Sequence, residues 1–173
     1  MKTLATLIAD AEFSAAMLRC AELFAAYRNR LPIIPYAYSR TRLLRRPAYE
    51  LIAMRWAPGS VSPIHDHGSS RCWVYMLEGS LDVQNYERDG EFDAQPVALR
   101  QTECVALRAG DVDHRLTPRE LHRVKNSAPE PAFSLQLYAE PILEYAIVDA
   151  HAGTARTVTA TCDLEISLAE LSG

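Results

Sequence analysis

Residues 58–67 have the sequence PGSVSPIHDH, and this stretch decides how the rest of the chain is interpreted. On an extended strand, side chains two residues apart project from the same face, so the imidazoles of His65 and His67 can converge on one ion. Imidazole is a ligand for iron, zinc, copper and nickel. Two surface histidines would give the same pattern, so the surrounding residues decide between a metal site and a polar surface.

The spacing around this pair resembles the first cupin motif, G-x5-H-x-H followed by a glutamate and a glycine. Gly59, His65, His67 and Gly79 fit the motif, and Cys72 stands where it has glutamate. The resemblance implies a mainly β fold, the cupin double-stranded β-helix or jelly-roll barrel. Without the glutamate, a bound dication would have an uncompensated charge and an open face for an anionic chelating substrate together with a gas molecule.

The second cupin motif ends in H-x3-N, which His122 and Asn126 match, and Gly110 fits the turn upstream. The resemblance covers residues 48–149 and makes His122 the third metal ligand beside the His-x-His pair. His114 is the rival third ligand, although it lacks this spacing. His151 lies beyond the last motif and is interpreted as a surface histidine.

Hydrophobic periodicity agrees with a β fold that has a short helical cap at its N-terminal end. Apolar residues at helical spacing occupy positions 3–30, and Pro32 and Pro35 end this pattern. Six arginines at 28–46 follow in a segment interpreted as a solvated linker, of which one arginine points inward at an anion. We expect a single domain over 1–173, with a helical cap at 1–35, a barrel at 48–160 and a tail or short packing element from residue 164. Strands are predicted at 48–57, 72–77, 80–88, 94–107, 121–126, 132–139, 144–149 and 155–160.

Composition excludes several classes of protein. The chain has 173 residues, 49% hydrophobic and 23% charged, which suits one packed domain. Lys and Arg number 18 against 22 Asp and Glu, a net charge of −4, which argues against a nucleic-acid binder. No apolar run approaches the roughly 20 residues of a membrane span. The four scattered cysteines and the absence of a secretion-signal pattern favour free thiols and a cytoplasmic location. A monomer is compatible with the sequence, which does not specify the oligomeric state.

Four stretches together resemble a narrower family, the iron-dependent thiol dioxygenases that include cysteine dioxygenase. They occur in family order: Tyr38-Ser39-Arg40 before the strand that ends in Trp56, then His65-Asp66-His67 with Cys72, then Leu121 to Asn126, then Ser134-Leu135-Gln136-Leu137-Tyr138. The resemblance implies that three histidines bind Fe(2+), that a small thiol substrate and dioxygen react there, and that the sulfur becomes a sulfinic acid.

The resemblance also implies roles for four further residues. Arg40 corresponds to the arginine that pairs with the substrate carboxylate, and Arg42 is a competitor for this role. Tyr38 corresponds to an aromatic residue of the pocket wall, although an ordinary core tyrosine is the alternative. Tyr138 corresponds to the tyrosine whose hydroxyl faces the iron. In some members that tyrosine is joined through a thioether to a cysteine at the position of Cys72, which is otherwise a small buried thiol. Met54 and Trp56 are interpreted as core residues.

One residue departs from the family pattern. Gln136 lies between Ser134 and Tyr138, where the family commonly has histidine in a hydrogen-bonded relay. Glutamine donates and accepts hydrogen bonds but cannot become cationic near neutral pH. We therefore do not carry over the family's usual proton transfer to this chain, and the identity of the product stays open.

The sequence therefore predicts a thiol dioxygenase that converts L-cysteine to cysteine sulfinic acid. A 3-mercaptopropionate dioxygenase and a diverged cysteine-oxidising cupin with another product are alternatives in the same class. A metal-binding sensor or structural cupin is the non-enzyme alternative, and a nucleic-acid binder built on the arginine-rich segment ranks behind it.

Overall fold

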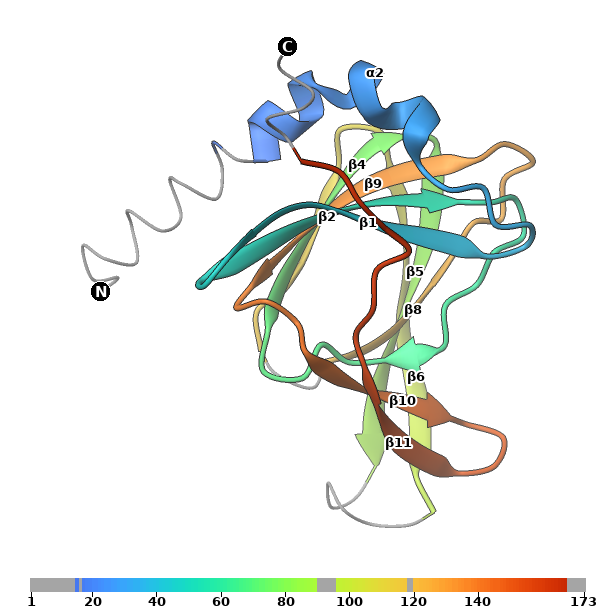
Figure 1. Cartoon of the computed structure of the whole chain (residues 1–173). Helices are drawn as coiled ribbons and strands as arrows, with labels where there is room; N and C mark the ends of the chain where they lie inside the picture. Colours follow the sequence, from blue (N-terminus) through green and yellow to red (C-terminus); the bar gives the residue numbers. More distant parts are fainter. Residues whose placement is uncertain (1–14, 16, 90–95, 118–119, 168–173) are drawn as a thin grey trace.

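The computed structural model of the chain describes residues 15, 17–89, 96–117 and 120–167. Within these residues the fold is mainly β, as predicted, with two six-stranded sheets of strand order β12-β1-β2-β9-β4-β7 and β11-β10-β3-β8-β5-β6 (Figure 1). The strands are β1 (Tyr38–Arg46), β2 (Tyr49–Trp56), β3 (Ile64–His65), β4 (Arg71–Glu78), β5 (Ser80–Asp89), β6 (Ala98–Arg108), β7 (Val112–Arg115), β8 (Leu121–Lys125), β9 (Ala132–Ala139), β10 (Glu144–Asp149), β11 (Thr154–Thr159) and β12 (Leu164–Glu165).

Short helices cover the outer face of the first sheet, which confirms the predicted helical cap (Figure 1). They comprise residues 17–22, α2 (Phe24–Tyr27) and η1 (Arg28–Arg30). The side chains of Cys20 and Tyr27 are fully buried in one apolar cluster with Leu51 and Phe133 of the sheet below. The apolar positions Leu4, Leu7, Ile8 and Phe13, which also contributed to the helical pattern, lie outside the described residues. None of the helices in the described part of the chain has the length and apolar character that a membrane span requires.

Successive side chains on a strand point to opposite faces of the sheet, and this alternation separates the outer cluster from the barrel interior. On β2, Leu51 and Ala53 face the helices, whereas Ile52, Met54 and Trp56 face inward. Both faces of the first sheet are thus covered, and β9 is buried at all eight positions. A strand that is buried on both sides can place polar residues toward the interior without exposing them to bulk solvent.

The arginine-rich segment is the clearest difference from the sequence-based expectation. Residues 38–46 form β1 rather than a solvated linker, and β1 pairs antiparallel with β2. Ser39, Thr41 and Leu43 are buried and alternate with Arg40 and Arg42. The sequence did not predict this strand because its inward positions hold charged arginines, whereas the usual strand pattern has apolar residues at the inward positions.

Three more strands, β3, β7 and β12, were not predicted because two to four residues give no periodic signal. The sequence predicts a tail or a short packing element from residue 164, and the structure shows that β12 is a packing element, which pairs parallel to β1.

The two cupin motifs are joined by main-chain hydrogen bonds, which places their histidines side by side. Gly59 N donates to Asn126 O at 3.0 Å, and Asn126 N donates to Ser60 O at 2.9 Å. Beyond these bonds, β3 pairs antiparallel with β8 so that His65 lies directly opposite His122. The last residue of the first motif, Gly79, has φ +78°, and a Cβ there would lie 2.9 Å from the Cβ of Ala132, so only glycine fits.

Candidate metal centre and substrate pocket

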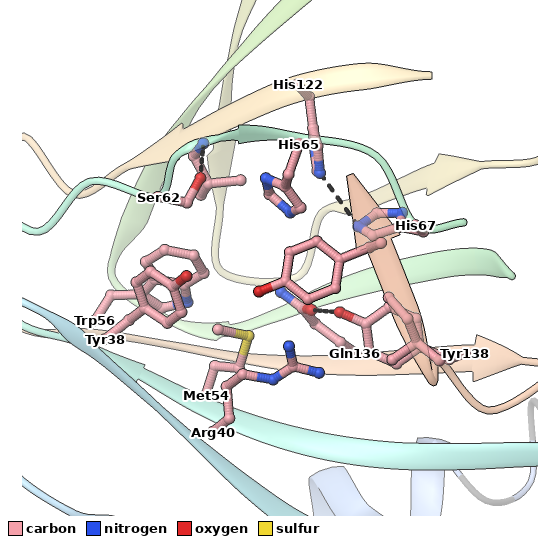
Figure 2. Close-up of a pocket in the computed structure, with 13 residues that line it drawn as sticks. Tyr38, Arg40, Met54, Trp56, Ser62, His65, His67, His122, Gln136 and Tyr138 are labelled. Carbon is pink, nitrogen blue, oxygen red and sulfur yellow. Dashed lines mark hydrogen bonds between the residues drawn. The ribbon is translucent and has the colours of Figure 1, made fainter. Parts of the chain in front are cut away.

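Three histidines that are distant in sequence meet at one point inside the barrel (Figure 2). One ring nitrogen from each of His65, His67 and His122 lies within 4.8 Å of the others, and the Nε2 atoms of His67 and His122 are 3.3 Å apart. Burial lowers the pKa of His65 to about 4 and holds the pKa values of His67 and His122 well below the usual value. Neutral imidazoles have a free lone pair, which is the form that binds metal ions.

Two contacts orient the ends of this cluster. His65 Nδ1 lies 3.0 Å from the carbonyl oxygen of Pro63, which only accepts hydrogen bonds, so Nδ1 is the protonated nitrogen and Nε2 is free to bind an ion. Between the two motif histidines, Asp66 is buried, and its Oδ1 accepts hydrogen bonds from Gly68 N at 3.1 Å and Ala146 N at 2.7 Å. Asp66 therefore fixes the turn that begins at Gly68, directly after His67, and joins it to β10.

The donor set fits a transition-metal dication. Three imidazoles form a compact set with no carboxylate or thiolate in the cluster among the described residues. Such nitrogen ligands suit Fe, Zn, Cu and Ni and leave coordination positions open. The rival ligand His114 is exposed on β7 opposite Trp73, and His151 lies in an exposed turn, so neither is part of the cluster.

A small pocket adjoins the three histidines. Figure 2 shows Arg40 reaching toward it from the side opposite the imidazoles, with Tyr38 stacked near Trp56 at one end. The ring centroids of Tyr38 and Trp56 are 4.7 Å apart. Met54 and Trp56, interpreted from sequence as core residues, are buried in the interior cluster and also line this pocket. The lining residues are Tyr38, Arg40, Met54, Trp56, Ser62, His65, His67, His122, Val124, Gln136, Tyr138, Ile142 and Tyr145.

The guanidinium of Arg40 is the only full charge on the side chains that line the pocket, since the histidines are neutral. Its Nε and Nη2 atoms are buried without a hydrogen-bond partner among the described residues. Its Cζ atom lies 5.8 Å from the ring centroid of Tyr138. A guanidinium that is always charged and lacks a partner creates a site for a small anion.

The competing arginine, Arg42, projects from the same face of β1 but has partners. Its Nε donates to Glu50 Oε2 at 3.3 Å, and its Nη1 pairs with Glu165. Glu50 is fully buried, and its Oε1 accepts a hydrogen bond from the main-chain N of Ile142 at 3.0 Å. The structure therefore leaves Arg40 free for a ligand and uses Arg42 to hold the segment that contains Ile142.

Cys72, Tyr138 and Arg115 occupy one row across three adjacent strands. Cys72 of β4 lies opposite Tyr138 of β9 on one side and opposite Arg115 of β7 on the other. The thiol is fully buried. Burial raises the pKa of Cys72 to about 12 and raises that of Tyr138 well above its usual value. Both groups therefore stay protonated at neutral pH.

Gln136 lies on the same face of β9 as Ser134 and Tyr138, and its Oε1 accepts a hydrogen bond from the Tyr138 hydroxyl (Figure 2). Ser134 has a different partner, because Trp56 Nε1 donates to Ser134 Oγ at 3.0 Å. The strand thus aligns Ser134, Gln136 and Tyr138 as the sequence pattern predicted, but the serine belongs to a separate hydrogen bond.

Two residues of the site were missed by sequence reasoning. Arg115 is buried behind the cluster, where its Nε donates to His122 Nδ1 at 3.4 Å and its Nη2 pairs with Asp113 at 2.7 Å. Arg115 was missed because β7, with only four residues, gives no periodic signal that would place this arginine on the inward face. Glu50 was also missed, since a lone glutamate in a strand is usually on the solvent face.

Residues 8–151 match the model of one protein family, Cysteine dioxygenase type I. The chain belongs to this family. Among its curated relatives, cysteine dioxygenase type 1 of Homo sapiens is 31% identical over 119 residues, and that of Danio rerio is 29% identical over 120 residues. Each match covers 65% of this chain and 56% of the relative, so the matched part spans about half the length of these cysteine dioxygenases.

Solved structures support the fold of this cysteine dioxygenase family member. An uncharacterized Klebsiella pneumoniae protein with a double-stranded β-helix domain has a TM-score of 0.53 at 18% identity, with 70% of this chain and 93% of that chain covered. A Thermus thermophilus protein has a TM-score of 0.51 at 21% identity, with 65% and 92% covered. These likenesses confirm the cupin-type double-stranded β-helix.

Proposed function

We propose that this chain is an iron(II)-dependent thiol dioxygenase that oxidises L-cysteine to cysteine sulfinic acid. The family membership supports a dioxygenase, and the three-histidine cluster supports a metal centre. The observation that carries the substrate class is Arg40, whose unpartnered guanidinium faces the same pocket as the three histidines. A substrate with a thiolate at one end and a carboxylate at the other would bind the metal with the first group and Arg40 with the second.

His65, His67 and His122 would hold the metal through ring nitrogens. Ferrous iron in this position supplies a Lewis acid that favours thiolate over thiol and a centre that reacts with dioxygen. In the overall reaction, the thiolate sulfur gains both oxygen atoms of O2 and becomes a sulfinate, with no other reductant required. Arg40 binds the carboxylate with parallel charge-assisted hydrogen bonds, which fixes the direction of the substrate as well as its position.

Tyr138 and the apolar walls complete the site in this proposal. The hydroxyl of Tyr138 stays protonated because burial raises its pKa, so it acts as a hydrogen-bond donor at neutral pH. Tyr38 closes one end of the pocket against Trp56. Cys72, beside Tyr138, is positioned for the thioether link that some relatives have. The pocket is small and suits a substrate of few heavy atoms.

A second candidate substrate is 3-mercaptopropionate. Among the residues that line the pocket there is no Asp or Glu to pair with the ammonium group of cysteine. A thiol that has the carboxylate but lacks the ammonium would leave no unpaired cation in the pocket. Gln136, which stands where the family commonly has the relay histidine, also favours a substrate other than cysteine.

The decisive experiment combines metal analysis with oxygen uptake and product mass. We expect iron in the purified protein, and oxygen uptake with cysteine or 3-mercaptopropionate but much less with cysteamine, which lacks a carboxylate. The product should be heavier than the substrate by two oxygen atoms. Tightly held zinc with no oxygen uptake after iron loading would instead indicate a structural or sensory cupin, and preferential use of cysteamine would remove the proposed role of Arg40.

We further propose one domain over 1–173, with a cap at 1–35 and a barrel at 48–160, located in the cytoplasm. The four cysteines, all within the described residues, are free thiols, which fits a reducing compartment.

A further inference from the structure

Residues 160–166, here called the crossing segment, run along the outer edge of β1. Ala160 N donates to Leu143 O at 2.8 Å at one end, and Ile166 N donates to Arg42 O at 2.8 Å at the other. Between them, β12 pairs parallel with β1. Figure 1 shows this stretch in red, passing from the β10–β11 hairpin across the front of the first sheet. The crossing segment lies beyond residue 151, where the family match ends.

Within the crossing segment, Asp163 forms hydrogen bonds with both main-chain polar groups of Arg40. Arg40 N donates to Asp163 Oδ2 at 2.8 Å, and Asp163 N donates to Arg40 O at 2.8 Å. On its other edge, Arg40 is in register with Met54 of β2. The backbone from which the guanidinium projects is therefore fixed on both edges, and the outer edge depends on one aspartate.

The carboxylate of Asp163 bonds to the main chain of Arg40 and leaves its guanidinium without a partner. Nε and Nη2 of Arg40 have no hydrogen-bond partner among the described residues. An aspartate that paired with the guanidinium would neutralise the charge that attracts a substrate carboxylate. Asp163 thus helps to position Arg40, while the charge of the Arg40 guanidinium stays available for a ligand.

The same segment also packs against the interior cluster. Ala160 and Cys162 are partly buried against this cluster, as are Tyr38 and Tyr145, which line the pocket. The position of the crossing segment therefore affects both the packing of the interior cluster and the position of Arg40. Loss of its attachment at Asp163 would allow β1 to shift at Arg40 without opening the barrel core.

We propose that Asp163 is a positioning residue that sets the guanidinium of Arg40 for the substrate carboxylate, and that it thereby determines the preference for thiols with a carboxylate over thiols without one. This inference rests on the proposed function of the pocket. It assigns a specificity role to a residue that contacts neither the histidine cluster nor the pocket.

The test compares Asp163→Ala with Asp163→Asn, whose amide oxygen still accepts the hydrogen bond from Arg40 N. Asp149→Ala is the matched control, because Asp149 Oδ1 also accepts main-chain hydrogen bonds, from His151 and Ala152 at 2.9 Å, in an exposed turn remote from Arg40 in the sheet order. Binding is measured without turnover, on protein loaded with Zn²⁺ under anaerobic conditions, with 3-mercaptopropionate and cysteamine as probes. Steady-state KM and kcat are measured separately on iron-loaded protein.

We expect Asp163→Ala to weaken 3-mercaptopropionate binding about tenfold, the scale of one lost charge-assisted hydrogen bond, and to raise KM more than it lowers kcat. Cysteamine binding should change less than twofold, and Asp163→Asn should recover most of the affinity. Equal weakening for both probes, or the same change in Asp149→Ala, would show a general structural effect and overturn the proposal.

The two proposals fail in different ways. If wild-type protein binds 3-mercaptopropionate in preference to cysteamine and Asp163→Ala loses that preference, yet no thiol is oxidised, the proposed function fails and the positioning role stands. If wild-type protein oxidises carboxylated thiols and Asp163→Ala keeps full affinity for 3-mercaptopropionate, the positioning role is wrong and the proposed function stands.

Discussion

The hydroxyl of Tyr138 donates its hydrogen bond to Oε1 of Gln136, two residues earlier on the same face of β9. Glutamine accepts this bond without a titratable group, so the orientation of the phenol does not depend on a protonation state near neutral pH. This arrangement differs from the histidine relay implied by the family pattern. Tyr138 is held by a neutral, pH-independent partner.

Replacement of Gln136 by Leu should lower kcat by about tenfold with a smaller change in KM, because the Tyr138 hydroxyl loses its buried acceptor and its orientation. Ser134→Ala is the control, since Ser134 is on the same face but bonds to Trp56. Gln136→His should retain activity and add an inflection to the pH profile of kcat that the wild type lacks. Full activity of Gln136→Leu would contradict the role given to this hydrogen bond.

Cys72 and Tyr138 are opposite each other on neighbouring strands, and both are buried. We expect a thioether between them in protein that has turned over with iron and oxygen. Peptide mass analysis should then find the two peptides joined and lighter by two hydrogens than their sum. Cys72→Ala should abolish the joined species, whereas Cys104→Ala, at an exposed cysteine on β6, should not. Separate peptides throughout, in fully active enzyme, would exclude the link.

The three buried histidines make the stability of the metal-free protein depend on pH. Burial lowers the pKa of His65 to about 4 and those of His67 and His122 well below the usual value. An unfolded chain has histidine pKa values near 6.5, so below that pH it binds protons that the native protein does not. The free energy of unfolding should therefore fall as pH falls from about 6.5 toward 5, by ~1.4 kcal/mol per pH unit for each such proton.

Urea unfolding of the metal-free protein at pH 7.5, 6 and 5 measures this dependence. His67→Asn should reduce its slope, because one buried group no longer titrates. The same measurement on His114→Asn and His151→Asn, at exposed positions outside the cluster, is the matched control for the side-chain change. A stability that stays constant from pH 7.5 to 5 would mean that the three histidines are not buried in their neutral form.

Asp113 balances the charge of Arg115 directly behind His122. The Asp113 carboxylate is 2.7 Å from Arg115 Nη2, and Arg115 Nε is 3.4 Å from His122 Nδ1. Asp113→Asn should weaken retention of a divalent metal by about tenfold, because the guanidinium charge is no longer compensated beside the dication. Competition with a chelator measures this. Glu130→Gln, at an exposed carboxylate, makes the same change in net charge and should have no effect.

The sequence predicted the parts of this site that are local in the chain and missed those that depend on pairing between strands. His65, His67 and His122 follow from motif spacing, and their meeting was predictable because the motifs imply a known fold. The sequence favours Arg40 over Arg42 only through the family resemblance, since both arginines occupy alternate positions on the same face of β1. Only the structure shows that Glu50, eight residues away, engages one and leaves the other free.

Glu50 therefore supports the pocket indirectly, and its replacement should separate stability from substrate affinity. Glu50→Ala leaves the N–H of Ile142 without its acceptor and Arg42 with only its exposed partner Glu165. The expected cost is about 3–5 kcal/mol of unfolding free energy, as for other buried ion pairs that lose one partner.

Glu50→Gln should cost less, because its amide oxygen still accepts the hydrogen bond from Ile142, although the charge that Arg42 needs is gone. Glu165→Gln removes an exposed partner of the same arginine and should cost less than 1 kcal/mol. Urea unfolding gives these differences, and KM reports the pocket, since Ile142 lines it. If Glu50→Gln and Glu165→Gln have equal effects on both quantities, the buried carboxylate does not hold the pocket wall, and the apolar contacts of Ile142 do so instead.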